Sequence, residues 1–221
     1  MLTNRLKEVL AYINPSDKLA DIGCDHGYLA LEAINKGLKL VQLVDNKEKP
    51  LAVAKKNLVD YESKAKVVYT LASGLTNILD EINVVAICGI GGDLISMILN
   101  DSIDIAKKMN SLILQANTKV RDLREYLNKH SFEIIDEKIV YDKGKFYQII
   151  KCSYQENAHC LSEIEIKYGP KLIKNKTNVF IDFLKYKLNH LKNIKNSIID
   201  INHPINKEIN EIEEILSYEN K

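Results

Sequence analysis

Residues 18–29 read Lys-Leu-Ala-Asp-Ile-Gly-Cys-Asp-His-Gly-Tyr-Leu, and this stretch decides the fold. Its apolar start, 18–23, lies between Pro15 and a glycine and is too short for a stable helix, so it predicts a buried strand. Helical spacing follows over residues 27–36 and stops at Gly37. A buried strand that turns through glycines into a helix is typical of the first unit of a parallel α/β sheet.

Strand and helix patterns alternate outward from that unit. Helices are predicted over residues 2–13, 48–59, 93–108 and 119–130, and strands over 38–44, 65–71, 84–88 and 112–115. Two adjacent strands, 132–141 and 145–151, follow and are joined by Asp142-Lys-Gly144, which is typical of a hairpin turn. Because the central strands are apolar throughout, we expect a doubly wound, Rossmann-like α/β sheet with an antiparallel pair at one edge.

The pattern changes after the last predicted strand. Residues 153–160 are polar and linker-like, and no β-type run follows them. Apolar residues recur every three or four positions from Phe180 to Ile198, and again from Ile205 to Leu216 after Pro204. This predicts two helices that meet near Pro204 as a helical hairpin resembling a short coiled coil. The predicted domains are residues 1–157 and residues 158–221.

Charge is balanced in the whole chain but uneven along it. The 221 residues carry 31 Lys and Arg against 30 Asp and Glu, so the protein is not a general polycation. Residues 167–195 hold eight lysines and one aspartate, whereas residues 205–219 hold one lysine and five glutamates. The basic stretch is a candidate nucleic-acid surface, with Lys167, Lys171, Lys174, Lys185 and Lys192 as its predicted contacts. The alternative is a solvated basic helix that faces its acidic partner.

Cysteine usage and the N-terminus point to an intracellular protein. The four cysteines form no C-x-x-C pair, so we expect neither a disulfide framework nor a metal site. The first ten residues are interrupted by charges and do not resemble a signal peptide, and no apolar run reaches the roughly 18 residues that span a bilayer. A cytoplasmic monomer without a membrane partner is the expectation.

Polar residues and glycines follow the predicted strands, where the carboxyl ends of parallel strands form a ligand site. In strand order they are Asp21, Gly23, Asp25 and His26, then Asp45 and Asn46, then Ser73 and Gly74, then Gly89, Gly91 and Gly92, and lastly Asn117. The glycines do not form G-x-G-x-x-G and there is no Walker A lysine. Acidic side chains repel phosphate and favour a cationic or amine-bearing ligand.

Several of these residues have a structural alternative. Asp25 could cap the helix that follows it, and Asn117 could cap a later one. Asp45 could accept the ribose hydroxyls of a bound nucleoside, a role shared by NAD and S-adenosylmethionine sites, or it could cap a helix or simply be solvated. The glycines of 89–92 could serve close helix packing, and Cys88 is more typical of a small core residue than of a nucleophile.

With these residues assembled, the chain resembles the TrmK-type tRNA adenine-N1 methyltransferases over nearly its whole length. The matching segments are D-I-G-C-D-H-G-Y-L (21–29), Asp45 with Pro50, C-G-I-G-G (88–92), L-I-L-Q-A-N (112–117), G-K-F-Y-Q-I-I (144–150) and Tyr168-Gly-Pro170. Ser73 stands where the family usually has Asp, and Ala116 where it has Pro. Gly27 replaces the usual Ala, which we expect to be a conservative change.

The resemblance implies a class I methyltransferase domain that binds S-adenosyl-L-methionine, and a reaction at N1 of adenosine 22 in the D-arm of tRNA. It implies that the strand-end residues from Asp21 to Gly92 named above hold the cofactor. Our hypothesis is that Tyr28 stacks on or orients the target base and that Asn117 bonds the edge of that base. The alternative for Tyr28 is core packing of the first helix. Two other classes stay open: a methyltransferase for another substrate, and a non-catalytic interaction protein with a degenerate cofactor fold. An NAD-dependent oxidoreductase is disfavoured by the missing glycine motif.

Overall fold

The computed structural model describes residues 2–197, 200 and 203–217. Its strands are β1 (Lys18–Ile22), β2 (Leu40–Asp45), β3 (Lys66–Leu71), β4 (Val84–Gly91), β5 (Ser111–Thr118), β6 (Phe132–Asp142) and β7 (Lys145–Tyr154). Its helices are α1 (Asn4–Ala11), α2 (Tyr28–Lys36), α3 (Glu48–Leu58), α4 (Gly92–Asp101), α5 (Ile103–Lys108), α6 (Val120–Lys129), α7 (Glu163–Tyr168), α8 (Pro170–Asn175), α9 (Asn178–Lys195) and α10 (Pro204–Ser217), with a short 3-10 turn at Val59–Tyr61.

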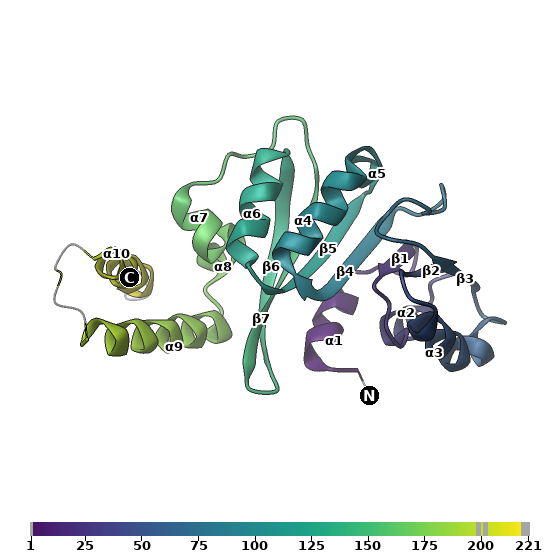
Figure 1. The fold of residues 1–221 in the computed structure, drawn as a ribbon, viewed down its shortest axis with the longest axis horizontal. Helices are drawn as coiled ribbons and strands as arrows, with labels where there is room; N and C mark the ends of the chain where they lie inside the picture. The colour runs from purple at the N-terminus through teal and green to yellow at the C-terminus, as the bar shows by residue number, and fades with distance from the viewer. Residues whose placement is uncertain (1, 198–199, 201–202, 218–221) are drawn as a thin grey trace.

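The strands form one sheet in the order β3-β2-β1-β4-β5-β7-β6 (Figure 1). Strands β1 to β5 are parallel, and β7 is antiparallel to both β5 and β6, so the predicted Rossmann-like sheet with its edge hairpin is confirmed. Lys143 and Gly144 turn the hairpin with positive φ angles of 48° and 82°, as a tight two-residue connection requires. The helix predicted over 93–108 divides at Ser102, whose backbone is not helical.

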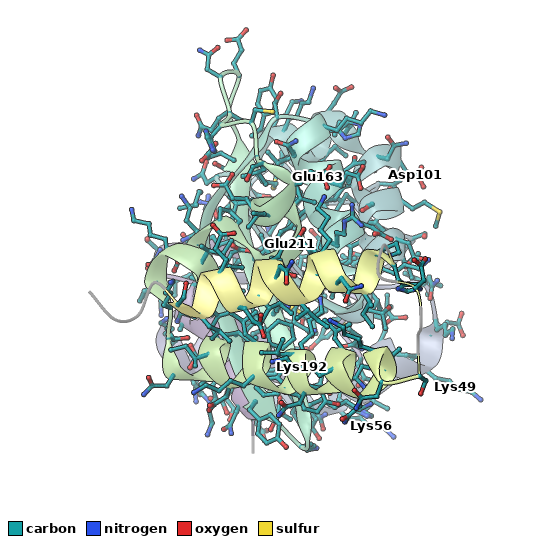
Figure 2. All side chains as sticks on the ribbon, turned by 90° about the vertical axis from the view of Figure 1, so that its left-hand side faces the viewer. Lys49, Lys56, Asp101, Glu163, Lys192 and Glu211 are labelled. Carbon is teal, nitrogen blue, oxygen red and sulfur yellow. The ribbon has the colours of Figure 1, made fainter. Side chains whose placement is uncertain are left out.

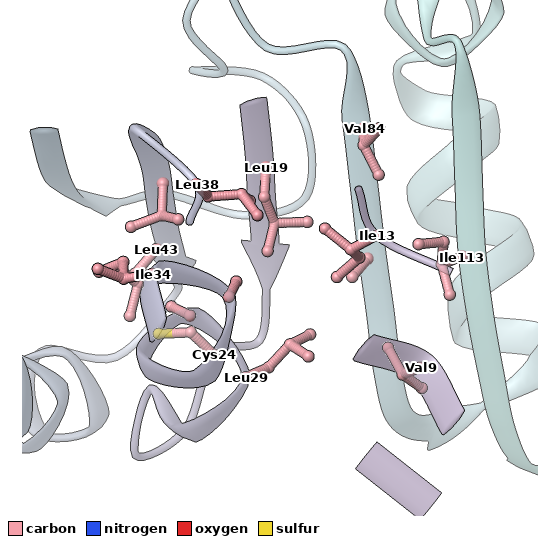
Figure 3. Packing of buried hydrophobic residues seen from close by; sticks show 14 of the residues in the cluster. Val9, Ile13, Leu19, Cys24, Leu29, Ile34, Leu38, Leu43, Val84 and Ile113 are labelled. Atoms are coloured by element: carbon pink, nitrogen blue, oxygen red, sulfur yellow. The ribbon is translucent and has the colours of Figure 1, made fainter. Parts of the chain in front are cut away.

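Core packing covers both faces of the sheet. Because side chains alternate along a strand, Leu19 of β1 belongs to the cluster under α1, α2 and α3, and Ala20 and Ile22 to the cluster under α4, α5 and α6. Figure 3 shows the first cluster, where Ile13, just after α1, lies between Leu19 and Val84 of β4. Burial on both faces explains why these strands are apolar without alternation.

The C-terminal helices form a third core with the edge hairpin. Ile139 of β6 packs there with Tyr168 and Phe180, and with Ile212 of α10. The predicted hairpin of α9 and α10 is present, and α10 is seen along its axis in Figure 1 while α9 lies across the view, so the two helices pack with crossed axes. Ile198 of the predicted stripe lies outside the described residues. The domain boundary after residue 157 stays a prediction.

A buried ion pair links these helices to the sheet. The Nε of Arg124 on α6 lies 2.7 Å from Oε1 of Glu137 on β6, and their side chains are 1% and 0% exposed. The other Glu137 oxygen accepts the backbone N–H of Lys171 at 3.0 Å, and the Arg124 guanidinium also donates to the carbonyl of Ile166. One pair of side chains therefore joins α6 and β6 to α7 and α8.

Candidate functional site

The turn between β1 and α2 brings acidic side chains to the carboxyl edge of the sheet. Gly23, Asp25 and Gly27 have left-handed backbone, with φ of 71°, 49° and 71°. The N–H of Gly23 donates to the Val44 carbonyl at 2.8 Å, which holds the turn against β2. Gly27 is the N-cap of α2 and no side chain caps that helix, so the alternative of Asp25 as its cap is wrong. The Asp25 carboxylate is exposed and available to a ligand.

Gly27 is not a conservative replacement in this chain. A Cβ built there would lie 2.7 Å from Cδ1 of Leu58 and 3.0 Å from Cδ2 of Leu43. The positive φ adds strain for any side chain at this position. The absence of a side chain allows α2 to begin directly against α3 and β2.

A cavity of about 510 Å³ opens beside this turn, between the ends of β1 and β2 and one face of α4. Of the predicted cofactor residues, it is lined by Gly23, Asp25, Asp45, Asn46, Ser73 and Gly74. The Asp45 carboxylate accepts the N–H of Lys47 at 3.0 Å, and Lys47 is the N-cap residue of α3, which has no side-chain cap. Asp45 is therefore part of the cavity wall and is not a helix cap.

The opposite wall of this cavity comes from α4 and was not predicted from the sequence. Leu94, Met97 and Ile98 line it, and the first two are exposed apolar side chains. Ile95 and Leu99 of the same helix are fully buried against the sheet. A helix that is apolar on two sides is the signal that could have revealed a ligand wall here.

A second cavity of about 310 Å³ adjoins the first and shares Gly23, Asp25 and Ile90 with it. It is lined further by Arg5, Asp21, His26, Tyr28, Cys88 and Gly89, among others. Tyr28 is half-exposed, with its ring 5.7 Å from that of His26, so it is not a core residue. Burial raises the pKa of the Cys88 thiol, which supports its interpretation as a neutral packing residue.

Asp21 is the buried carboxyl group of this site. It is 4% exposed, and among the described residues no side chain or backbone group donates a hydrogen bond to its carboxylate. Burial, followed by the negative charges of Asp45 and Asp25, raises the pKa of Asp21 to about 7. A carboxyl group held in this way is stabilised by a ligand that brings a positive charge.

The glycines at the end of β4 and the start of α4 have different roles. Gly89, with φ of 85°, lines the smaller cavity, whereas Gly91 and Gly92 line neither. A Cβ on Gly92 would lie 2.3 Å from the carbonyl oxygen of Lys119, so this glycine allows α4 to start against the turn that follows β5. Gly92 thus serves helix packing, and the predicted contact of Gly91 and Gly92 with a cofactor stays a prediction.

Asn117 at the end of β5 is held in a network instead of capping a helix. Its Nδ2 donates to the Gly89 carbonyl at 2.6 Å, and its Oδ1 accepts from the buried Gln115 at 3.1 Å. The Gln115 side chain in turn accepts the N–H of Gly89 at 3.1 Å. The next helix, α6, has Lys119 as its N-cap residue and no side-chain cap. Two amide side chains thus fix the loop that borders the smaller cavity.

Arg5 completes this network, and it was not predicted from the sequence as a site residue. It belongs to α1, 112 residues away from Asn117, and donates to Asn117 Oδ1 at 3.1 Å. Its guanidinium also lies over the Tyr147 ring, 5.0 Å from the centroid. A single basic residue in an amphipathic N-terminal helix carries no local sequence signal for such a role. Only the packing of α1 against the end of β5 brings the Arg5 guanidinium into the lining of the smaller cavity.

Comparison with protein families identifies the family of this chain. The model of the TrmK family, described as tRNA (adenine(22)-N(1))-methyltransferase, matches residues 19–221. The chain belongs to the TrmK family.

A relative in sequence and two solved structures agree with this membership. A tRNA (adenine(22)-N(1))-methyltransferase of Bacillus subtilis is 30% identical over 206 residues, covering 89% of this chain and 85% of the relative. The structure of Streptococcus pneumoniae Sp1610 with S-adenosyl-L-methionine has a TM-score of 0.89 at 30% identity and covers 98% of this chain and 100% of its own. That of M. capricolum TrmK with S-adenosyl-homocysteine has a TM-score of 0.84 at 31% identity, covering 98% of each chain.

S-adenosyl-L-methionine is the cofactor of the TrmK family, and the residues at this edge fit it. The molecule carries an ammonium group and a sulfonium, and Asp21, Asp25 and Asp45 provide three carboxylates around the two adjoining cavities. Asp21 is buried without a partner, so the site holds an unmatched acid where a cationic ligand would bind. Ser73, in place of the family's usual aspartate, still lines the larger cavity.

The predicted RNA-binding lysines of this TrmK-family chain divide into two groups. Lys167 lies 2.8 Å from Glu211 and Lys192 lies 2.7 Å from Glu213, so both pair with α10, which is adjacent to α9 in Figure 2. Lys171, Lys174 and Lys185 have no ion-pair partner among the described residues. The alternative of internal pairing therefore holds for Lys167 and Lys192, whereas no glutamate partner competes for Lys171, Lys174 and Lys185 within the described part of the chain.

Two further observations concern the described residues as a whole. Within them, no helix combines the length and the apolar character that crossing a bilayer would require. The same residues contain no cluster of three or more His, Cys, Asp and Glu side chains arranged to hold a metal ion.

Proposed function

We propose that this chain transfers the methyl group of S-adenosyl-L-methionine to N1 of adenosine 22 in tRNA, as a monomer in the cytoplasm. The observation that carries the proposal is the unpartnered, buried Asp21 in the lining of the smaller cavity, in a chain of the TrmK family. In the larger cavity, Asp45 accepts the ribose hydroxyls and Asn46 borders them. Ser73 and Gly74 border the adenine, and the apolar face of α4 covers it.

The smaller cavity is where the methyl group and the target base meet. Asp21, Asp25 and His26 surround the methionine end, and Gly89 runs beneath it. When bound, the cofactor supplies an electrophilic methyl group. Adenine N1 already has a lone pair, so the chain needs no general base and contributes mainly by positioning the two reactants. The N1 edge is normally paired, so the base must be exposed before it enters.

Asn117 and the tail lysines complete the proposal. Asn117 is committed to Gly89 and Gln115, so it acts on the base edge through its remaining amide hydrogen and through the shape of the loop. Gly91 and Gly92 support that loop by packing. The lysines of the tail bind tRNA phosphates, with Lys171, Lys174 and Lys185 contributing more than Lys167 and Lys192, whose glutamate partners compete with phosphate.

The deciding experiment is incubation of the protein with labelled S-adenosyl-L-methionine and unmodified tRNA, followed by mapping of the methylated nucleotide. We expect label at N1 of adenosine 22. Label on a protein or a small molecule would favour a methyltransferase of another substrate class. Failure to bind S-adenosyl-L-methionine by calorimetry would favour a non-catalytic interaction protein.

Replacing Asp45 tests the ribose contact. Asp45→Asn keeps an acceptor for the Lys47 N–H but removes the charge and one acceptor oxygen. We expect the dissociation constant for S-adenosyl-L-methionine to rise about tenfold, because a hydrogen bond to a charged group contributes roughly 1.5–3 kcal/mol. Calorimetry measures this, with the exposed Asp60→Asn, outside both cavities, as the matched control. Equal affinities of the two variants would remove Asp45 from the site.

Replacing Tyr28 tests the base contact. The half-exposed ring supports nothing in the core, so Tyr28→Ala should fold normally. We expect kcat/KM for tRNA to fall about tenfold with unchanged cofactor affinity, because stacking of a base on an aromatic ring contributes roughly 1–3 kcal/mol. Tyr28→Phe retains the ring and should retain the activity. Full turnover by Tyr28→Ala with normal tRNA affinity would exclude Tyr28 from the mechanism.

A further inference from the structure

An aromatic groove lies apart from the cofactor cavities, between the tip of the β6–β7 hairpin and α9. Its volume is about 550 Å³, and Tyr141, Phe146, Phe183 and Tyr186 form its aromatic lining. The ring centroids of Tyr141 and Phe146 are 4.9 Å apart, and those of Phe146 and Tyr186 are 5.9 Å apart. Tyr141 and Tyr186 are nevertheless 55% and 67% exposed. Phe146 and Phe183 attach the groove to the C-terminal core, whereas the two tyrosine side chains are largely exposed to solvent.

The groove opens at the same edge of the sheet as the cofactor cavities. Strand β6 is antiparallel to β7, which is antiparallel to β5, so β6 runs parallel to β5 and ends at the carboxyl edge. Figure 1 shows the hairpin tip on the same lower side as α1, whose Arg5 lines the smaller cavity. A substrate large enough to cross several strands can contact both places at once.

The charges around the groove indicate what it binds. Lys143, Lys145 and Lys185 are exposed next to it, and within the part of the chain that the structure describes none of them has an ion-pair partner. Exposed aromatic rings beside free lysines match a nucleobase with its phosphate. Asp182, which also lines the groove, can accept a hydrogen bond from a base N–H. A symmetric contact with a second copy would instead bring the same lysines together, which is unfavourable.

We propose that this groove stacks an unpaired nucleobase of the tRNA substrate, at a distance from the base that is methylated. The proposal rests on the proposed function, because it assumes that tRNA lies along this edge of the sheet. The groove then acts as a second anchor, which affects tRNA affinity and leaves the chemistry in the smaller cavity unchanged.

The test uses the exposed Tyr186 in the full-length protein. For Tyr186→Ala we expect KM for tRNA to rise about tenfold, with kcat and the affinity for S-adenosyl-L-methionine unchanged. Ile194→Ala, a truncation of another exposed apolar residue on the same helix, is the matched control and should behave as the original chain. The chain has no tryptophan, so Tyr186→Trp introduces a single tryptophan, whose selectively excited fluorescence tRNA should quench by stacking.

Each outcome decides the proposal. Unchanged KM in Tyr186→Ala, or no tRNA quenching of Tyr186→Trp, would overturn it while methyl transfer by the original chain continues. A dimer in sedimentation that Tyr186→Ala dissociates would overturn it in favour of a second copy. Absence of methyl transfer to tRNA by the original chain would instead contradict the proposed function, and the quenching measurement would still decide whether the groove binds RNA.

Discussion

Asp21→Asn is expected to make the free protein more stable above pH 7 and its binding of S-adenosyl-L-methionine weaker. Burial raises the pKa of Asp21 from 3.8 to about 7, so the folded chain holds this proton more tightly than the unfolded chain. The free energy of unfolding therefore falls as the pH rises from about 4 to 7, because the folded chain must ionise the buried Asp21. Above pH 7 the carboxyl group is charged in both states, and the full destabilisation by the buried charge is present. That cost is at most about 4 kcal/mol, and asparagine avoids it.

Urea unfolding and calorimetry at pH 5 and pH 8 measure both effects. The stability gain of Asp21→Asn should be largest at pH 8 and smaller at pH 5, where the native carboxyl is largely protonated. Cofactor affinity of the original chain should weaken by up to tenfold per pH unit below 7, and Asp21→Asn should bind at least tenfold more weakly at pH 8. Loss of stability in Asp21→Asn at pH 8, or unchanged cofactor affinity, would contradict this account.

Arg124→Ala is expected to destabilise the fold by about 3–5 kcal/mol, because it leaves the charge of Glu137 buried without its partner. The lost guanidinium also bonds Gln148 and the Ile166 carbonyl, so α6, β7 and α7 lose their common contact. Denaturant unfolding measures the change. The double replacement Arg124→Met with Glu137→Leu should recover much of the loss, because no unpaired charge remains.

Arg121→Ala is the matched control on the same helix. Arg121 lies 3.4 Å from Glu163, but both side chains are exposed, so we expect a change below about 1 kcal/mol. If Arg124→Ala cost no more than Arg121→Ala, the buried pair would not be what joins the C-terminal helices to the sheet.

Some parts of the site were predictable because they depend on local pattern and on chain order. Asp21 and Asp45 lie at the carboxyl ends of apolar strands, and parallel topology brings such ends to one edge. The edge hairpin was predictable from Lys143-Gly144 between two β-type runs. The alternatives for Asp25 and Asn117 were not separable from sequence, since a cap and a ligand contact have the same residue preference.

The sequence by itself determined the succession of strands and helices, the mainly parallel sheet and the acidic character of the cofactor site. It could do so because burial and chain reversal leave local patterns of apolar residues and glycines. Only the tertiary structure decided the rest. Arg5 meets Asn117 across 112 residues, α4 turns a second apolar face to the larger cavity, and α10 neutralises some tail lysines and leaves others free. These contacts depend on how separate elements pack, and a side chain's partner across the fold leaves no periodic trace in its own segment.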